Sequence, residues 1–420
     1  MEFAEITLDN FVVFVGNNNS GKTMVMQLIY GLRKELENFI APVTGIKQTE
    51  MNGQYLIRCD QGWFKEVELG INKYLDQNKS RIIGDIFGMS ISAEELRVEL
   101  KEKESTYFVS SVSKYQDEEW KERKNGIHVD ILQYENGESV KAFENQISDS
   151  IYLEDAVKEV PQIIWRVILS EKNTLDLEQL FLPASRSGLQ FLYKYYFAGG
   201  TEGNLVVPIK DFLRFLQLYA EDQQLQETRK DLLEFGEKHL LQGKVTQKDG
   251  ETFYIDKIAD KMISLYMASS MIHELTPFMK ALGATQQIDW LYCDEVENSL
   301  HPLLQREMAR WLIRMVNAGM HVMVSSHSDT MASRLNNLFM LSYLKQKKNV
   351  YEMLLELGLT ENDLLRSNVK AGVYEFRTGK QGKTVVEKLE FIDHPLIGYD
   401  FKLFGSNLDK LYNEADRITG

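Results

Sequence analysis

The hydrophobic and polar positions follow their clearest pattern between residues 11 and 39. Residues 11–15 are five consecutive apolar residues, which predicts a short buried strand. From residue 23 to about residue 39 the apolar positions recur with a helical period, which predicts an amphipathic helix. Between strand and helix lies GNNNSGKT, a stretch of small and polar residues. The order strand, glycine-containing loop and helix predicts an α/β fold.

A second strongly patterned region lies much later in the chain. Residues 290–293 are an apolar run that predicts a strand, and the acids Asp294 and Glu295 follow it directly. The next stretch, LLQREMARWLIRMVNAG, predicts a helix that ends at its glycine. Residues 322–324 predict another strand, which leads into a polar segment that contains His327. Each of these two predicted strands is therefore followed by side chains that could take part in metal binding or catalysis.

The long segment between these regions mixes several patterns. Three runs within residues 50–115, QYLIRC, WFKEVELGI and STYFVSSV, predict strands. Residues 140–180 and 207–241 predict helices, and KVTQKDGETFYI predicts a hairpin with Asp249 and Gly250 in its turn. A second hairpin is predicted for AGVYEFRTGKQGKTVVEKLEF. Because no long heptad run is present, we expect a compact insertion rather than a long coiled coil.

The composition narrows the class of protein. The chain has 420 residues and a net charge of −14, which argues against a surface covered with basic residues, although a local basic groove for DNA stays possible. Two cysteines, Cys59 and Cys293, fit a reducing compartment better than a disulfide framework. No apolar run approaches the roughly 20 residues that span a bilayer, and acids stand near the first residue where a signal peptide carries basic ones. We therefore expect a soluble, cytoplasmic protein with no membrane partner.

The stretch GNNNSGKT matches the phosphate-binding pattern GxxxxGK[ST]. Its glycines allow successive backbone N–H groups to point at phosphate oxygens, and the start of the following helix adds a partial positive charge. Lys22 is expected to reach the β- and γ-phosphates, and Thr23 is expected to hold Mg²⁺. The predicted nucleotide-binding residues are Gly16, Asn17, Asn18, Asn19, Ser20, Gly21, Lys22 and Thr23. The pattern does not name a function, because kinases, GTPases and motor ATPases all contain it.

The polar residues of the second region could complete such a site. Asp294, at the end of a strand, suits a Mg²⁺ ligand, and Glu295 beside it suits a group that orients or deprotonates the attacking water. His327, at the tip of the next strand, could contact the γ-phosphate. The alternatives are an acidic loop without catalytic function and a structural histidine. The order of the motifs along the chain favours the catalytic interpretation.

Together, GNNNSGKT, CDEVENSLHP and VSSHSDTM resemble the ABC-type ATPases of the SMC, RecF and OLD kind, which are grouped broadly with the AAA family. The resemblance covers most of the chain. It implies that Asp294 coordinates Mg²⁺, that Glu295 is the catalytic acid and that His327 is the switch histidine. It also implies that residues 297–302 form a loop that reaches across a dimer.

The resemblance predicts a division into three parts. Residues 1–115 would form the first half of an ATPase head, with the P-loop and an antiparallel β-lobe. Residues 116–255 would form a compact, mostly helical insertion. Residues 256–420 would form the second half of the head, with the signature-like, Walker B and His-switch segments. The expected fold is thus an α/β, P-loop ABC-type ATPase head, whose lobe-junction glutamine has three candidates: Gln48, Gln54 and Gln61.

Two further stretches resemble the family less closely. LYMASSMIHEL stands where the family places its signature helix, but the LSGGQ of transporters is absent, and Ser269 and Ser270 stand in its place. A serine hydroxyl at a helix start could still contact the γ-phosphate held by a partner subunit. This departure disfavours a transporter motor. FLPASRSGL contains Arg186, for which a phosphate contact and a structural ion pair are equally open.

We expect an ATPase that binds and hydrolyses ATP with Mg²⁺ as a homodimer or a higher homo-oligomer. Relatives among stand-alone ATPases of anti-phage defence systems suggest that it controls a separate effector, either a nuclease or a toxin. A separate effector is expected because the segment after His327 is too short for the nuclease domain of many relatives. One alternative is a RecF-like repair or recombination ATPase that acts directly on DNA. Another is a nucleotide-gated scaffold that holds a toxin silent with little turnover.

Overall fold

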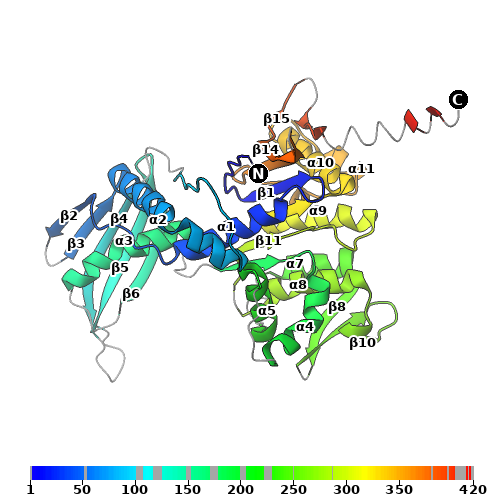
Figure 1. Ribbon diagram of the computed structural model, residues 1–420, viewed down its shortest axis with the longest axis horizontal. Coiled ribbons are helices and arrows are strands. Elements are labelled where there is room, and N and C mark those ends of the chain that lie inside the picture. The colour runs from blue at the N-terminus through cyan, green and yellow to red at the C-terminus, as the bar shows by residue number, and fades with distance from the viewer. Residues whose placement is uncertain are drawn as a thin grey trace. The chain divides into compact units, whose positions relative to one another are not determined.

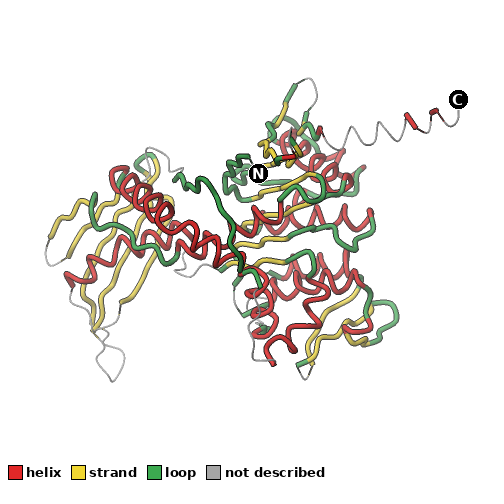
Figure 2. Tube along the Cα trace, in the orientation of Figure 1, coloured by secondary structure: helices red, strands yellow, loops and turns green. Residues whose placement is uncertain are grey.

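The computed structural model describes most of the chain, which forms two compact units (Figures 1 and 2). The first unit contains residues 1–30 and 178–420, and the second contains residues 31–177. The described residues are 2–51, 54–100, 107–116, 125–147, 153–170, 178–198, 205–221, 229–248, 250–285, 287–379, 382–394, 397–402, 413–414 and 416–417.

A six-stranded sheet organises the first unit. Its strand order is β14-β13-β1-β12-β11-β7. Every neighbouring pair is parallel except β13 and β14, which are antiparallel. The strands are β1 (Phe11–Gly16), β7 (Gln179–Leu182), β11 (Trp290–Cys293), β12 (His321–Ser326), β13 (Ala371–Thr378) and β14 (Thr384–Lys388). Strands far apart in the sequence thus become neighbours, and the carboxyl ends of β1, β12 and β11 lie at one edge of the sheet.

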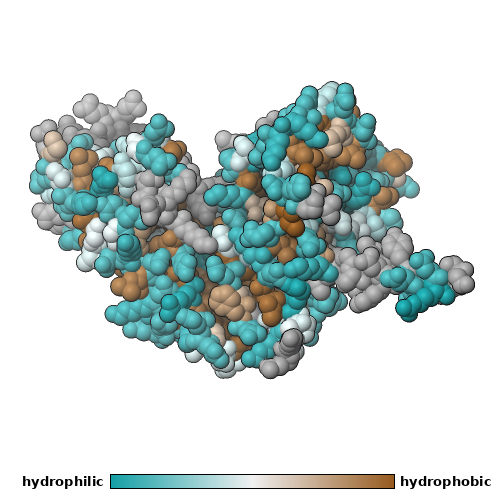
Figure 3. All heavy atoms as spheres, turned by 90° about the horizontal axis from the view of Figure 1, so that it is seen from above, coloured by the Kyte–Doolittle hydropathy of each residue, from teal (hydrophilic) through white to brown (hydrophobic). Residues whose placement is uncertain are grey.

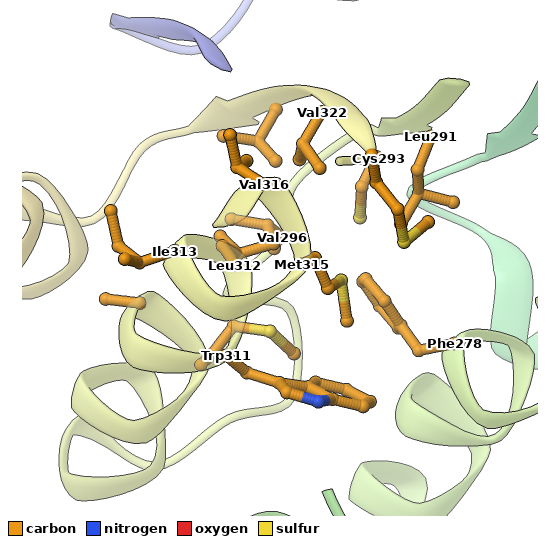
Figure 4. Packing of buried hydrophobic residues seen from close by; sticks show 14 of the residues in the cluster. Phe278, Leu291, Cys293, Val296, Trp311, Leu312, Ile313, Met315, Val316 and Val322 are labelled. Carbon is orange, nitrogen blue, oxygen red and sulfur yellow. The ribbon is translucent and has the colours of Figure 1, made fainter. Parts of the chain in front are cut away.

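Both faces of this sheet are buried, which explains why β1 is apolar at every position. Phe11 and Val13 pack into a core with the helices α8, α9 and α10, whereas Val12 and Phe14 pack with α1 on the other face. Figure 4 shows Phe278 of α8 beside residues of α9 in the larger core. These helices are α1 (Lys22–Leu36), α8 (Ser270–Gly283), α9 (Pro302–Asn317) and α10 (Asp329–Lys345).

The remaining elements of the first unit surround this core. A small antiparallel sheet has the order β10-β9-β8, and β15 pairs with β16. The hairpin predicted for KVTQKDGETFYI is confirmed, although Asp249 lies outside the described residues. The bounds are α4 (Arg186–Ala198), α5 (Val207–Leu218), α7 (Lys230–Phe235), the π-helix η1 (Gly236–Leu241), β8 (Gly243–Lys248), β9 (Glu251–Asp256), β10 (Met262–Ser264), the 3₁₀ helices η2 (Leu265–Met267) and η3 (Glu361–Asp363), α11 (Tyr351–Glu356), β15 (Phe391–Ile392) and β16 (Gly398–Tyr399).

The second unit contains an antiparallel five-stranded sheet with the order β2-β3-β4-β5-β6. Its strands are β2 (Ile46–Met51), β3 (Gln54–Cys59), β4 (Tyr107–Gln116), β5 (Asn125–Glu135) and β6 (Glu138–Ile147), and its helices are α2 (Gln61–Phe87) and α3 (Leu153–Ser170). Strand β4, which ends at Gln116, pairs with β5, which begins at Asn125. The sheet therefore continues past residue 115, where the sequence predicted a domain limit. The limits expected at residues 115 and 255 therefore do not coincide with those of the two units, because β5 and β6 complete the sheet that β2–β4 begin.

Two local predictions in the second unit are wrong. The run WFKEVELGI, expected as a strand, lies in the 27-residue helix α2, which begins after the N-cap Asp60 and ends before the left-handed Gly88. Its buried positions, including Val67, Ile71 and Leu75, recur every four residues, a period that the short run could not reveal. Residues 140–147, expected as helix, belong to strand β6, which pairs with β5.

The face in Figure 3 is mostly hydrophilic, with hydrophobic side chains in scattered places. Among the described residues, no helix is both long enough and apolar enough to span a bilayer.

Candidate functional site

The loop after β1 has the backbone shape that a phosphate cradle needs. Gly16 ends the strand with φ +148°, and a Cβ atom there would lie 2.3 Å from the carbonyl oxygen of Phe376. Asn19 and Gly21 also have positive φ, at 59° and 90°. Only a residue without a side chain fits at the first position, and positive φ at the others curls the loop inward. The helix α1 begins at Lys22, so its free N–H groups face the loop.

Lys22 folds back over this loop and is only 3% exposed. Its ammonium group donates to the carbonyl oxygens of Gly16 and Asn17, both at 2.9 Å, and to Ser20 Oγ at 3.3 Å. Burial lowers its pKa from 10.5 to about 8, against the opposing charges of Asp294, Glu297 and Glu295. The cation therefore lies among oxygen acceptors that phosphate oxygens could replace.

Thr23 meets Asp294 directly beside this lysine. Thr23 Oγ1 donates to Asp294 Oδ2 at 2.8 Å, although 271 residues separate the two. Ser325 Oγ donates to the other carboxylate oxygen at 2.5 Å. Strand β12 lies between β1 and β11, so its serine is in a position to bridge the residues that follow those two strands. The hydroxyl of Thr23 and the carboxylate of Asp294 thus share one point at the sheet edge.

Glu295 has an unusual backbone for a residue with a side chain. Its φ is +48°, in the left-handed region that costs a non-glycine residue on the order of 1 kcal/mol. The strained turn is held by the N–H of Glu295, which donates to Ser325 Oγ at 2.9 Å, and by the N–H of Val296, which donates to the carbonyl oxygen of Ser325 at 3.1 Å. The turn leaves the Glu295 carboxylate partly exposed beside the site, where a water could reach it.

His327 lies between the phosphate loop, Gly16–Thr23, and the acidic turn, which contains Asp294 and Glu295. Its Nδ1 atom is 2.8 Å from the carbonyl oxygen of Gly16 and 3.1 Å from Lys22 Nζ, and its Nε2 atom is 3.5 Å from Glu295 Oε1. The backbone N–H of His327 donates to Glu297 Oε1 at 2.5 Å. The imidazole therefore contacts both the phosphate loop and Glu295.

The residues present suit a nucleotide with Mg²⁺. A hydroxyl oxygen from Thr23 and a carboxylate oxygen from Asp294 are hard ligands of the kind that Mg²⁺ prefers. No group of three or more metal-binding side chains gathers among the described residues. Mg²⁺ is commonly held by one or two protein oxygens together with phosphates and water.

A family comparison agrees with this geometry. Residues 11–333 match the family described as "AAA domain, putative AbiEii toxin, Type IV TA system". The chain belongs to this AAA family. The match begins at β1 and ends within α10, so it includes the phosphate loop, the acidic turn and His327. The description of this family names a toxin and a type IV toxin–antitoxin system.

Several solved structures are similar at low identity. The SMC head domain from Thermotoga maritima is 10% identical, with 92% of each chain covered and a TM-score of 0.33. The SMC head bound to the C-terminal winged-helix domain of ScpA is 10% identical, with 90% of each chain covered and a TM-score of 0.35. The SMC head from Pyrococcus furiosus, bound to the C-terminal domain of ScpA, is 10% identical over 98% of this chain and 93% of that chain, with a TM-score of 0.33. None of the curated proteins matches the chain.

Arg186, whose role the sequence left open, lies within this AAA-family site as a structural ion pair. It is 1% exposed, and its Nε atom lies 2.7 Å from Glu274 Oε2. Its guanidinium also donates to the carbonyl oxygens of Asp294 at 2.9 Å and Glu295 at 3.3 Å. It donates in addition to the carbonyl oxygens of Pro183 at 3.2 Å and Glu274 at 3.3 Å.

Ser269 and Ser270 lie at the exposed start of α8. Ser269 is its N-cap residue, but its hydroxyl makes no capping hydrogen bond. In the part of the chain that the structure describes, no hydrogen bond joins either serine to the phosphate loop of the same chain. Of the three candidate glutamines, Gln48 lies in β2, Gln54 begins β3 and Gln61 begins α2.

Two residues of the site were missed as functional candidates. Ser325 holds both Asp294 and the Glu295 backbone, and Glu297 accepts from the His327 backbone rather than only belonging to a loop. A signal for Ser325 existed in the sequence, because the apolar residues 322–324 are followed by two serines, Ser325 and Ser326. Glu297 gave no comparable signal, since it looked like part of a polar loop.

Proposed function

We propose that this protein binds and hydrolyses ATP at the site formed by the phosphate loop and the acidic turn. The observation that carries the proposal is the hydrogen bond between Thr23 and Asp294 beside the buried Lys22. Phosphate oxygens would take the place of the loop carbonyls around Lys22, and backbone N–H groups of the loop would bind the same phosphates. Bound ATP is favoured over a merely structural loop because three independent motifs meet at one point.

The residues around the proposed nucleotide have distinct tasks. Thr23 and Asp294 would hold Mg²⁺, which when bound neutralises developing charge on the phosphates. Glu295 would orient a water and accept its proton, since its carboxylate is partly exposed and its backbone is fixed. His327 would donate to the γ-phosphate from its place beside Gly16. The strained φ of Glu295 supports a functional role, because such strain concentrates at active sites.

The proposed active form is a homodimer or a larger homo-oligomer. Ser269 and Ser270 are exposed at a helix start and carry no capping bond, so their hydroxyls are available to a phosphate presented by a second copy. ATP would then lie between Gly16–Thr23 of one subunit and these serines of its partner. Binding would close the two heads, and hydrolysis would open them.

The proposed role is control of a separate effector in anti-phage defence. The family description, which names a toxin and a type IV toxin–antitoxin system, supports a toxin as the effector, and a nuclease is the other candidate. Our proposed route to such a partner lies within residues 116–255, which include β5 and β6 of the second unit and α4 and α5 of the first. DNA binding by the purified chain that depends on ATP and falls steeply with salt would instead favour the RecF-like alternative.

The central test is Glu295→Gln. The amide keeps the size of the side chain but cannot accept a proton, so ATP binding should stay within about twofold while turnover falls at least about 100-fold. Fluorescent-ATP titration and phosphate release measure the two quantities. Glu297→Gln is the matched control, because it also neutralises a nearby acid, and it should reduce turnover far less. Hydrolysis by Glu295→Gln at the wild-type rate would show that another group activates the water.

A further inference from the structure

We propose that Arg186 is a positioning residue that couples the acidic turn of the nucleotide site to the Ser269–Ser270 end of α8. This inference rests on the proposed function, since it concerns how the same site communicates with the segment offered to a partner subunit. Three groups of contacts carry it: those of Arg186 to the turn, those of Arg186 to α8, and a parallel link through Gln190.

The contacts to the turn fix the backbone on both sides of Glu295. One guanidinium nitrogen, Nη1, donates to the carbonyl oxygen of Asp294 at 2.9 Å, and the other, Nη2, donates to the carbonyl oxygen of Glu295 at 3.3 Å. These two carbonyls belong to the peptide groups that flank the residue with positive φ. The two terminal nitrogens of a planar guanidinium hold both carbonyls in a fixed fork, a geometry that the single ammonium nitrogen of a lysine does not reproduce. The direction of the Glu295 side chain therefore depends on Arg186.

The contacts to α8 use the remaining face of the same guanidinium. Nε donates to the carbonyl oxygen of Glu274 at 3.3 Å and lies 2.7 Å from its carboxylate. Glu274 is 1% exposed, and burial raises its pKa although the charge of Arg186 opposes that rise. The two charges are buried together, so a movement of one that left the other behind would be costly.

A second side chain strengthens the link between α4 and α8. Gln190, one turn after Arg186, donates from Nε2 to the carbonyl oxygen of His273 at 2.6 Å and to that of Arg186 at 3.3 Å. Both side chains are buried. The start of α4 is thus attached to consecutive residues of α8, His273 and Glu274, about one turn after the exposed serines.

The position of Glu274 in α8 explains why movement would reach the serines. From Ile272 to Gly283 every residue of α8 is buried, whereas Ser269 and Ser270 are exposed. A displacement of the acidic turn when nucleotide binds would be transmitted through one guanidinium to the first turn of α8. Conversely, a phosphate bound to the serines would change the position of Glu295 through the same contacts.

A neighbouring arginine provides a matched control. Arg229 is also buried at 9% exposure, donates to the carbonyl oxygens of Ala281 at 3.4 Å and Ile288 at 2.9 Å, and lies 3.9 Å from Asp289. It contacts α8 as well, but near the end of the helix and away from the acidic turn. Loss of a buried arginine in general and loss of this coupling can therefore be separated.

The experiment compares Arg186→Lys with Arg229→Lys in the full chain. Fluorescent-ATP titration gives the Kd, phosphate release gives kcat, and hydrogen exchange of residues 265–272 with and without ATP reports on the start of α8. We expect Arg186→Lys to bind ATP within about twofold of wild type, to lose at least about tenfold in kcat and to lose the ATP-dependent change in exchange. Arg229→Lys should keep both responses, even if its Tm falls.

A second variant covers the case in which Arg186→Lys does not fold. Glu274→Gln leaves the bonds of Arg186 to the acidic turn in place but removes the charge that ties it to α8. It should keep most of the turnover and lose the exchange response of residues 265–272.

Each outcome decides the proposal. Wild-type turnover and exchange in Arg186→Lys, or in Glu274→Gln an unchanged exchange response, would overturn the coupling and leave the ATPase intact. Equal losses in Arg186→Lys and Arg229→Lys, in proportion to their Tm, would also overturn it, because the role would be structural. A wild-type chain that neither binds nor hydrolyses ATP would overturn both the coupling and the proposed function.

Discussion

Two helix starts in this molecule carry small polar residues, and they differ in what surrounds them. At the start of α1, Lys22 contacts three oxygen acceptors of its own loop and Thr23 contacts Asp294. At the start of α8, Ser269 and Ser270 are exposed, and the N-cap hydroxyl makes no capping bond. The first start is a nearly complete site within one chain. The second has donors but no acceptor of its own, which is why we propose that a partner supplies one.

The largest expected effect tests whether the α1 start works alone. Lys22→Ala removes the charged donor that would bind the β- and γ-phosphates, so ATP binding should weaken about 100-fold. The measurement is titration with a fluorescent ATP analogue at a concentration where the protein is monomeric. Ser269→Ala is the control and should bind ATP as the wild type does. Equal weakening in the two variants would remove the distinction between the two helix starts.

A smaller effect tests whether the α8 start needs a partner. The double variant Ser269→Ala with Ser270→Ala loses hydroxyl donors to the γ-phosphate of a second subunit, so kcat should fall about tenfold while the Kd for ATP on the monomer is unchanged. Turnover per chain should rise with protein concentration in the wild type and much less in the variant. A rate per chain that is independent of concentration in the wild type would argue against a shared site.

The smallest expected effect is a dependence of ATP affinity on pH, and it involves only the start of α1. The pKa of Lys22 is lowered from 10.5 to about 8 by burial, and phosphates would favour its charged form, so ATP binding takes up a proton above pH 8. The Kd for ATP should rise roughly eightfold between pH 7.5 and pH 9 in the wild type and should not change in this way in Lys22→Ala. Since the folded state binds this proton less tightly than the unfolded state, the contribution of Lys22 to stability improves as pH rises from about 8 to 10.5.

Much of the first unit could be predicted from the sequence, because each of its motifs consists of residues that are close together along the chain. FVVFVGNNNSGKT contains a strand, a loop and a helix start in consecutive residues, and the structure has them as β1, the loop and α1. Two predictions failed in the second unit. The run WFKEVELGI was too short to show the helical period of the buried positions in α2, and residues 140–147 of β6 were expected as helix. Arg186 could not be assigned, because ion pairing with Glu274 depends on contacts across 88 residues.

The sequence by itself determined the chemistry of the candidate groups: a glycine loop with lysine and threonine, an acidic pair after a strand, and a histidine after the next. Local side-chain spacing and backbone freedom are enough to specify such features. Only the tertiary structure decided that Thr23, Asp294 and Ser325 meet, that Glu297 turns to His327 and that Arg186 joins the acidic turn to α8. The physical reason is the strand order, because β12 lies between β1 and β11 and brings three distant segments to one edge of the sheet.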